Sequence, residues 1–371
     1  MADTISLSLF LSGDVMMGRG IDQLLPWPCE PTLYEEYMAS AKDYLALAEA
    51  ANGAISHPVD PLYPWGDALK ELNDRRPDAR IINLETSVTH CARPEPKGIN
   101  YRMSPENFVS IKNAQTDCCV LANNHVLDWG EPGLIETLAT IRAAGIATAG
   151  AGLTIDKASA PAALPVTGKG RVLVYACAAT DSGVPLAWLA GPDRPGVNVL
   201  PDLSSRTAAH IGTEIAANRK AGDLVIVSVH WGGNWGYPVP PAHMAFAHAL
   251  VDEAGIHLVH GHSSHHPKAI EVYKGQLILY GCGDFITDYE GIAGYESFRD
   301  DLVLMYLPAL RTGDGMLARL TMIPYQLRRF RLNRAAQQDA EWLRDVLDRE
   351  SRRFNTCVTL DKSGCLQLEW S

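Results

Sequence analysis

The sequence predicts an α/β fold, in which a sheet carries helices on both of its faces. Short apolar runs rich in β-branched residues alternate along the chain with segments of helical periodicity. Each run stops at a polar or glycine-containing turn, as buried strands do. The chain has 371 residues, 47% of them hydrophobic, which is enough for a full core and excludes wholesale disorder. Strands that alternate with helices are typical of a sheet covered on both sides.

The expected elements follow in chain order. Strands are predicted at 6–11, 80–84, 118–121, 171–176, 224–229 and 257–259. Helices are predicted at 65–73, 133–144 and 205–220, between these strands. The tail is predicted to form a strand pair at 302–307 and 317–323, followed by a charged amphipathic helix at 335–354.

Residues 26–66 differ from the rest because they contain six prolines and one helix-like stretch, at 34–51. We expect an insertion over the strand ends, either a surface excursion or a substrate lid. The pieces fit one main domain, residues 1–330, with a C-terminal helix and strand at 331–371 packed on it. The oligomeric state is left open.

Composition restricts the partners and the compartment. With 32 basic and 43 acidic side chains the formal charge is -11, which argues against nucleic acid or an anionic membrane as the main partner. The N-terminus MADTISLSLFLSGD lacks the basic start and long apolar run of a secretory signal, and we expect no membrane anchor. Eight cysteines without a CxxC pair read as buried thiols in a reducing compartment, so we expect a cytoplasmic protein.

Metal-competent side chains follow five of the predicted strands. Twelve histidines are present, and eight of them lie between positions 230 and 266. Carboxylates, an amide and imidazoles are the mixture that two divalent ions about 3.5–4 Å apart require. The sequence therefore predicts a centre of two divalent ions, Mn, Zn, Fe or Co, at one edge of the sheet. The candidates are Asp14, Glu85, Asn124, His125, His230, His262 and His265.

The motifs that carry these residues resemble one family. Gly-Asp-Val-Met-Met-Gly-Arg at 13–19, Asn-Leu-Glu at 83–85, Ala-Asn-Asn-His at 122–125, His-Trp-Gly at 230–232 and Gly-His-x-x-His at 261–265 are similar to the poly-γ-glutamate capsule-synthesis (CapA-like) family. That family is a branch of the calcineurin-like metallophosphoesterase superfamily. The resemblance covers residues 5–290 and implies a four-layer α/β/β/α metallophosphatase-like sandwich with a two-metal centre at the strand ends.

The resemblance also implies roles for individual residues. Asp14 and His265 would bind the first ion, and Glu85 would occupy the position of a bridging carboxylate. Asn124, His230 and His262 would bind the second ion, and His125 would be a general acid. His260 would be either a further ligand or a donor behind one, because it shares a strand face with His262. The other four clustered histidines, at 243, 248, 257 and 266, are expected to be structural.

This chain departs from the superfamily pattern in two motifs. Met16 follows Asp14 where Asp-x-His is usual, and Glu85 has no accompanying Gly-Asp pair. These departures favour chemistry on a peptide or γ-glutamyl-type amide, either hydrolysis or transfer at the carbonyl. The alternatives are a metal-dependent peptide epimerase, which the resemblance also suggests, a phosphoesterase, and a non-catalytic binding protein of capsule biosynthesis. The expected partner is a peptide or polyglutamate-like substrate.

Several polar and aromatic residues near these motifs have two interpretations each. Asp128 could orient His125 or cap the next helix. Arg19 and Arg102 could bind a substrate carboxylate or form surface ion pairs. Trp231 and Trp235 could line a cleft or pack under their loop. Asp284 and Asp288 follow a strand and could reach the centre. Phosphate-loop, dinucleotide-turn and nucleophile-elbow motifs are absent from the sequence.

Overall fold

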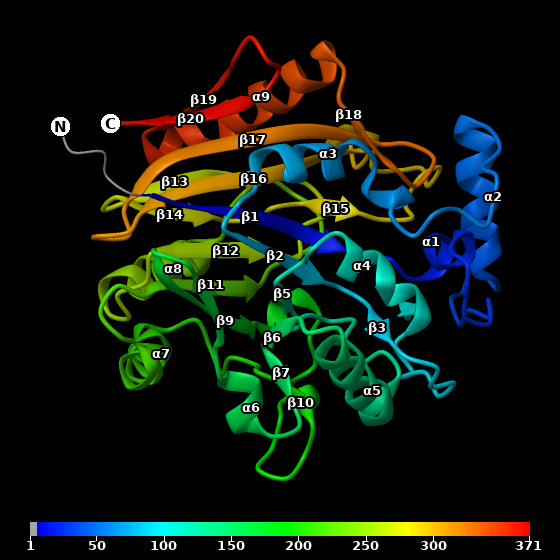
Figure 1. The fold of residues 1–371 in the computed structure, drawn as a ribbon, viewed down its shortest axis with the longest axis horizontal. Helices are drawn as coiled ribbons and strands as arrows, with labels where there is room; N and C mark the ends of the chain where they lie inside the picture. The colour runs from blue at the N-terminus through cyan, green and yellow to red at the C-terminus, as the bar shows by residue number, and fades with distance from the viewer. Residues whose placement is uncertain (1–5) are drawn as a thin grey trace.

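A computed structural model describes residues 6–371 and contains two large sheets packed face to face (Figure 1). In the first sheet β1, β2, β5 and β6 are parallel, and β16 and β17 continue from β1 in antiparallel fashion. Short β15 lies parallel to the end of β1, and β18 lies beside β17. The order is β19 (Thr356–Leu360), β20 (Leu366–Trp370), β17 (Leu317–Leu327), β16 (Leu302–Arg311), β1 (Ser6–Val15), β2 (Ala79–Leu84), β5 (Cys118–Val120) and β6 (Ala147–Ala149), with β15 at Asp284–Ile286 and β18 at Leu332–Arg334.

The second sheet is smaller and has a parallel centre. Strands β9, β11, β12 and β14 run parallel, and antiparallel hairpin partners close both edges. The order is β13 (Ile270–Tyr273), β14 (Gln276–Leu279), β12 (Leu258–His262), β11 (Leu224–His230), β9 (Gly170–Ala178) and β8 (Ala162–Val166).

Alternating side chains of the second sheet define the layers. Along β11, Leu224 and Ile226 join the core shared with the first sheet, whereas the intervening valines join a separate core with α7 (Ser205–Asn218) and α8 (Pro241–Asp252). Helices α3 (Gly66–Arg75) and α4 (Val109–Asn113) lie over the first sheet, and α5 (Gly130–Ala143) flanks its β6 edge (Figure 1). This arrangement is the expected α/β/β/α sandwich.

The observed strands and helices agree with the predicted ones, with small shifts. The helix expected at 34–51 begins later, as α2 (Ala41–Asn52), because the Ser40 side chain accepts a hydrogen bond from the Lys42 N–H and caps it. β1 extends to Val15 because its end pairs with both β2 and β15. The remaining elements are α1 (Arg19–Leu24), α6 (Ile155–Ser159), β3 (Ser87–Val88) paired with β4 (Arg102–Met103), and β7 (Ala151–Gly152) paired with β10 (Gly196–Val197).

The C-terminal segment completes the first sheet. β20 pairs with β17, β19 pairs with β20, and α9 (Gln337–Ser351) packs mainly against β19. The expected boundary at residue 330 and the lid role of residues 26–66 stay predictions. The domain and signal-peptide expectations include residues 1–5, which lie outside the described residues.

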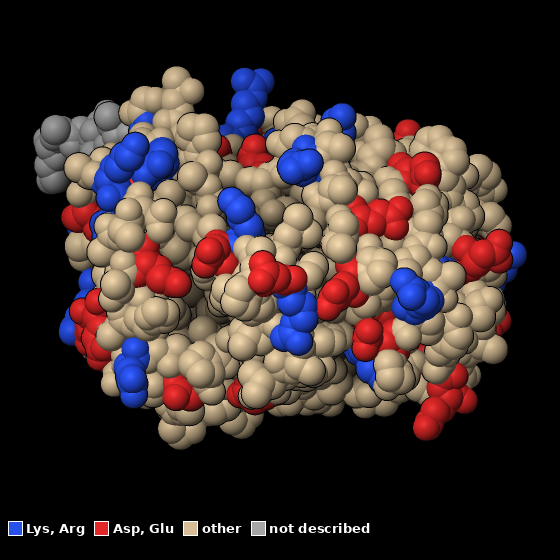
Figure 2. Space-filling view, turned by 90° about the horizontal axis from the view of Figure 1, so that it is seen from below, with Lys and Arg blue, Asp and Glu red and all other residues tan. Residues whose placement is uncertain are grey.

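The cysteines differ in exposure. All eight are free; six are buried, as expected, whereas Cys91 and Cys357 are partly exposed. Within residues 6–371, the helices are too short or too polar to span a membrane. Acidic and basic side chains are interspersed on the face seen in Figure 2, without a broad area of one sign.

Candidate metal centre

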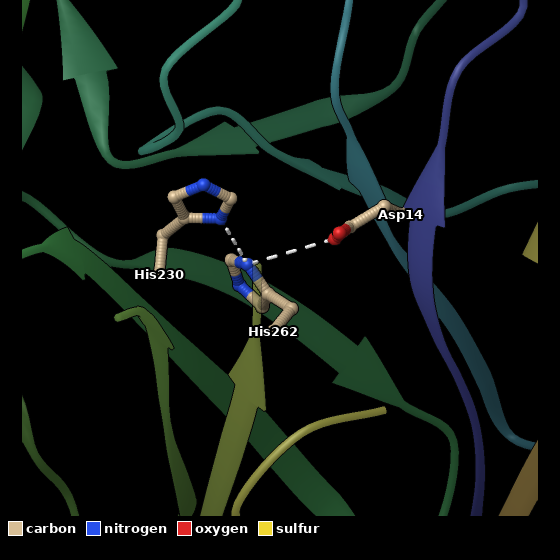
Figure 3. Close-up of side chains that lie close together, drawn as sticks. All are labelled: Asp14, His230 and His262. Atoms are coloured by element: carbon tan, nitrogen blue, oxygen red, sulfur yellow. Dashed lines mark hydrogen bonds and ion pairs between the residues drawn. The ribbon is translucent and has the colours of Figure 1, made fainter. Parts of the chain in front are cut away.

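The candidate ligands meet because parallel strands end at one edge. Asp14 on β1 stands in register with Asn83 on β2 and with Asp284 on β15. In the second sheet His230 on β11 stands in register with His262 on β12. The carboxyl ends of the strands in both sheets therefore place these side chains close together. Figure 3 shows His262 between Asp14 and His230.

A glycine allows β15 to reach this edge. A Cβ atom on Gly13 would lie 1.7 Å from the backbone oxygen of Gly283, so any larger residue would separate β1 from the segment that leads into β15. With glycine at position 13, the backbone N–H of Asp14 donates a hydrogen bond to the backbone oxygen of Gly283 over 3.0 Å. The close approach places Asp284 beside Asp14.

Two groups of side chains could each hold a metal ion, and they share Asp14. One consists of Asp14, His230 and His262, and the other of Asp14, His265 and Asp284; within each group the ligand atoms lie within 4.8 Å of one another and all residues are buried. The Nδ1 atom of His262 is 3.9 Å from Oδ1 of Asp14, and Nδ1 of His265 is 2.8 Å from Oδ1 of Asp284. Buried Asp and His side chains grouped in this way are compatible with bound metal ions.

Without a cation, the buried carboxylates of the centre repel one another and are unfavourable in their charged form. Burial, and then the neighbouring Asp284, raise the pKa of Asp14 from 3.8 to about 7. Burial and the charge of Asp14 raise the pKa of Glu85 well above its usual value. One oxygen each of Asp14 and Asp284 is buried without a hydrogen-bond partner. A divalent cation would remove both penalties, so these residues fit a metal.

Two of the three candidate imidazoles, those of His230 and His262, are in the neutral state that a metal ion requires. Burial is the main cause that lowers the pKa of His230 and of His262 well below the usual value, so both rings are neutral. Their Nδ1 atoms face each other over 2.8 Å. His265 differs, because Asp284 raises its pKa against the opposing effect of burial.

Beside the centre, His125 and Asp128 form a hydrogen-bonded pair. Nδ1 of His125 is 2.6 Å from Oδ2 of Asp128, and Lys97 donates to Oδ1 of Asp128 over 2.7 Å. Burial lowers the pKa of His125 to about 4, so the ring is neutral and its Nδ1–H donates to the carboxylate. Nε2 of His125 lies 3.9 Å from Oε1 of Glu85. Asp128 thus orients His125 toward the centre.

Glu85 and Asn124 lie at the centre but in neither group of three. The Asn83 amide donates to Asp14 over 2.7 Å and to Glu85 over 3.1 Å, and so holds the two carboxylates together. The role of Glu85 as a bridging carboxylate stays a prediction; the residue common to both groups is Asp14. The side-chain oxygen of Asn124 is 3.1 Å from Nε2 of His230.

The four residues expected to bind substrate have different surroundings. Arg102 donates to the backbone oxygens of Cys91 and Glu30 and stacks over Trp129, 4.0 Å from the ring centre. Trp231 is buried, and its ring nitrogen donates to the backbone oxygen of Tyr280, the residue after β14. Arg19 and Trp235, in contrast, line a cavity next to His265.

This cavity has a volume of about 450 Å³ and aromatic walls. Arg19 is the one Lys or Arg side chain among the described residues that line it. Its guanidinium is paired with both oxygens of Asp288 and with Glu35, the closest contacts being 2.6 and 2.8 Å. The aromatic lining residues are Tyr37, Tyr44, Tyr101, Trp235, Tyr289 and Tyr295.

Sequence reasoning left three neighbours of the centre out of the predicted set. Asp284 was noted only as a residue that could reach the centre, and the signal for it was its place after a strand, next to Gly283. Lys97 lies in an irregular loop whose sequence carries no periodic signal. Tyr289, whose hydroxyl is 3.4 Å from Nε2 of His265 and bonds to Tyr101, is equally unmarked by any motif.

Comparison with known proteins shows one family and several relatives. The family model described as bacterial capsule synthesis protein PGA_cap matches residues 8–289. A probable polyglutamine synthesis accessory protein of Mycobacterium tuberculosis is 46% identical over 364 residues, covering 98% of this chain and 96% of that protein. The capsule biosynthesis protein CapA of Bacillus anthracis is 26% identical over 322 residues, 86% of this chain and 67% of that one. The solved structure of a phosphatase from Mycoplasma pneumoniae aligns with a TM-score of 0.47 at 12% identity, over 87% of this chain and 94% of its own.

Proposed function

This chain belongs to the bacterial capsule synthesis protein family PGA_cap, and from that premise we propose that it is a metal-dependent enzyme acting on an amide of a peptide or polyglutamine-type chain. One observation carries the proposal: two buried ligand groups share Asp14 at the edge where both sheets end. A purely structural role would not require an acidic cluster with buried carboxylate oxygens that lack partners.

Divalent ions in these two groups would supply Lewis acidity, which polarises a carbonyl and lowers the pKa of a bound water. Asp14 would be common to both ions, with His230 and His262 on one side and His265 and Asp284 on the other. Asn83 keeps Asp14 and Glu85 in place through its amide.

The protein's own acid–base group is His125. Its pKa of about 4 leaves Nε2 unprotonated near neutral pH, and Nδ1–H is held by Asp128. Nε2 can therefore take a proton from the attacking water, as its oxygen bonds to the carbonyl carbon, and give that proton to the departing nitrogen as the C–N bond breaks. Lys97 balances the charge of Asp128, to which it is paired. His125 therefore acts as a base before it acts as an acid, because the neutral ring must take a proton before it can give one.

The cavity favours a chain with uncharged side chains. Apart from an ion held at the centre itself, an acidic chain would find no unpaired Lys or Arg there among the described residues, since the charge of Arg19 is already neutralised by Asp288 and Glu35. Aromatic walls suit amide groups and aliphatic stems, which stack on rings and need no counter-charge. The polyglutamine named for the Mycobacterium tuberculosis relative is a chain of this kind.

Isotope labelling of a model substrate tests the reaction. The metal-loaded protein is incubated with short glutamine and glutamate oligomers, α- and γ-linked, in heavy-oxygen water and separately in heavy water. We expect heavy oxygen in newly formed carboxylates, faster for glutamine oligomers, and its loss in His125→Gln. The matched control is His210→Gln, an exposed histidine on α7.

The other outcomes refute the proposal in distinct ways. Deuterium at Cα without cleavage would identify an epimerase instead. Turnover confined to an aryl phosphate would identify a phosphoesterase. Oligomer binding that His125→Gln leaves unchanged, without any labelling, would identify a non-catalytic binding protein; the names of the two relatives use the term accessory protein.

A further inference from the structure

A chain of buried hydrogen bonds connects the backbone of β1 to His262, across the interface of the two sheets. Nε2 of His260 lies 2.8 Å from the backbone oxygen of Ser12. Nδ1 of His260 lies 3.0 Å from Oγ of Ser228, and the same Oγ lies 2.8 Å from Nε2 of His262. All four residues are fully buried. His260 belongs to neither group of candidate ligands.

Chemistry fixes the direction of every bond in this chain. A carbonyl oxygen only accepts, so the proton of neutral His260 must be on Nε2. Nδ1 of that ring then carries a lone pair and accepts the hydroxyl proton of Ser228, because Oγ of Ser228 lies 3.0 Å from this nitrogen and 3.4 Å from the backbone oxygen of His260. With its own proton committed, Oγ of Ser228 accepts from His262, whose proton must therefore be on Nε2.

The consequence is a lone pair on Nδ1 of His262, aimed at the centre. This atom is 2.8 Å from Nδ1 of His230 and 3.9 Å from Oδ1 of Asp14. Nε2 of His230 faces the side-chain oxygen of Asn124 over 3.1 Å, which places the proton of that ring on Nε2 as well. Two lone pairs then face each other, and a cation that both nitrogens share would remove their repulsion.

We propose that His260 and Ser228 are positioning residues that lock His262 in its metal-binding tautomer. This tautomer lock begins at the backbone carbonyl of Ser12, which fixes the tautomer of His260. The inference rests on the proposed function only in that the centre takes a divalent ion. Ser12 belongs to the strand that carries Asp14, so the lock also ties the two sheets together at the centre.

Metal affinity of a Ser228→Ala variant tests the lock. Without Oγ, the Nε2–H of His262 has no acceptor, and the proton is better placed on Nδ1, where it can donate to His230. We expect the dissociation constant for Mn²⁺ or Zn²⁺ to be 10- to 100-fold larger than in wild type, measured by competition with a fluorescent chelator. Two single variants of His260 are compared in the same way. His260→Gln keeps one donor and one acceptor and should retain part of the metal affinity of wild type, whereas His260→Leu should lose it.

The matched control is Ser351→Ala, which removes another buried hydroxyl that accepts a backbone hydrogen bond, at Ile270. The dissociation constant of this control for the metal should rise by no more than threefold. A Ser228→Ala variant that binds metal as tightly as the control would overturn the lock.

Nitrogen NMR of histidine-labelled, metal-free wild-type protein reads the tautomer directly and needs no variant to fold. We expect His262 and His260 both to show the Nε2–H pattern. An Nδ1–H pattern at His262 would refute the inference. A wild-type protein with the expected tautomers but no affinity for any divalent ion would instead refute the proposed function.

Discussion

Replacing Asp14 by Asn should stabilise the metal-free protein at alkaline pH while abolishing its stabilisation by metal. The aspartate is fully buried among acidic neighbours, and one of its oxygens has no hydrogen-bond partner. An asparagine of the same shape keeps an oxygen for the Asn83 amide and carries no charge. The substitution therefore removes a destabilising charge that the fold retains for binding a cation.

The magnitude follows from the pKa of Asp14, which burial and Asp284 raise from 3.8 to about 7. Because the folded state binds this proton more tightly, stability is lost as the pH rises from about 4 to about 7. At about 1.4 kcal/mol per pKa unit, the penalty is roughly 2 kcal/mol at pH 5 and roughly 4 kcal/mol at pH 8. The advantage of the variant should thus grow by roughly 2 to 3 kcal/mol over that range.

Urea unfolding of both proteins in a chelator at pH 5, 6.5 and 8 measures this difference, since titrating groups that do not interact with Asp14 cancel between the two. Addition of Mn²⁺ at about one hundred times its dissociation constant should stabilise wild type by about 2.7 kcal/mol and leave the variant unchanged. The reasoning is refuted if the variant is the less stable protein at pH 8 in chelator, or if the difference does not depend on pH.

Three further perturbations have expected outcomes. Arg19→Met would leave Asp288 and Glu35 buried without their cation, and should lower the free energy of unfolding by about 3–5 kcal/mol in urea titrations; a loss below about 1 kcal/mol would contradict the pairing. His257 has a pKa lowered to about 4, mainly by burial, so the unfolded chain binds its proton more tightly and stability falls as the pH drops from 6.5 toward 4. His257→Gln should therefore be more tolerant of acid than wild type by roughly 2 to 3 kcal/mol at pH 4.5, compared with pH 7.5, and equal sensitivity would show that the ring is not buried as a neutral group. Asp128→Asn should lower amide turnover about 10²- to 10⁴-fold at unchanged metal content by elemental analysis, because His125 loses the carboxylate that orients it; an unchanged rate would remove this pair from the mechanism.

The family and the layers of the fold were accessible to sequence reasoning. The CapA-like resemblance is confirmed by the family match over residues 8–289, and its α/β/β/α layers are confirmed by two large sheets that share one core. The alternation of strands and helices predicted helices on both faces of a sheet, whereas the second sheet has helices on one face and the first sheet on the other. The family motifs and the alternation are encoded locally, in the residues that end a strand and in periodicities that extend over a few residues. Roles for the individual ligands stay predictions.

The environment of each charged side chain was decided only by the tertiary structure. Arg19 follows Asp14 by five residues and looked available to a substrate, but its partner Asp288 comes from 269 residues further along the chain. Asp284 enters the centre because Gly13 lets β15 approach β1.

By itself, the sequence determined which strands deliver metal-competent side chains, because parallel strands bring their carboxyl ends to one edge whatever the loops between them do. The tertiary structure alone decided which carboxylate the two ligand groups share, where Arg19 is neutralised, and how His260 connects Ser12 to His262. These properties depend on contacts between distant segments, and side-chain charges and hydrogen bonds are set by such neighbours rather than by spacing along the chain.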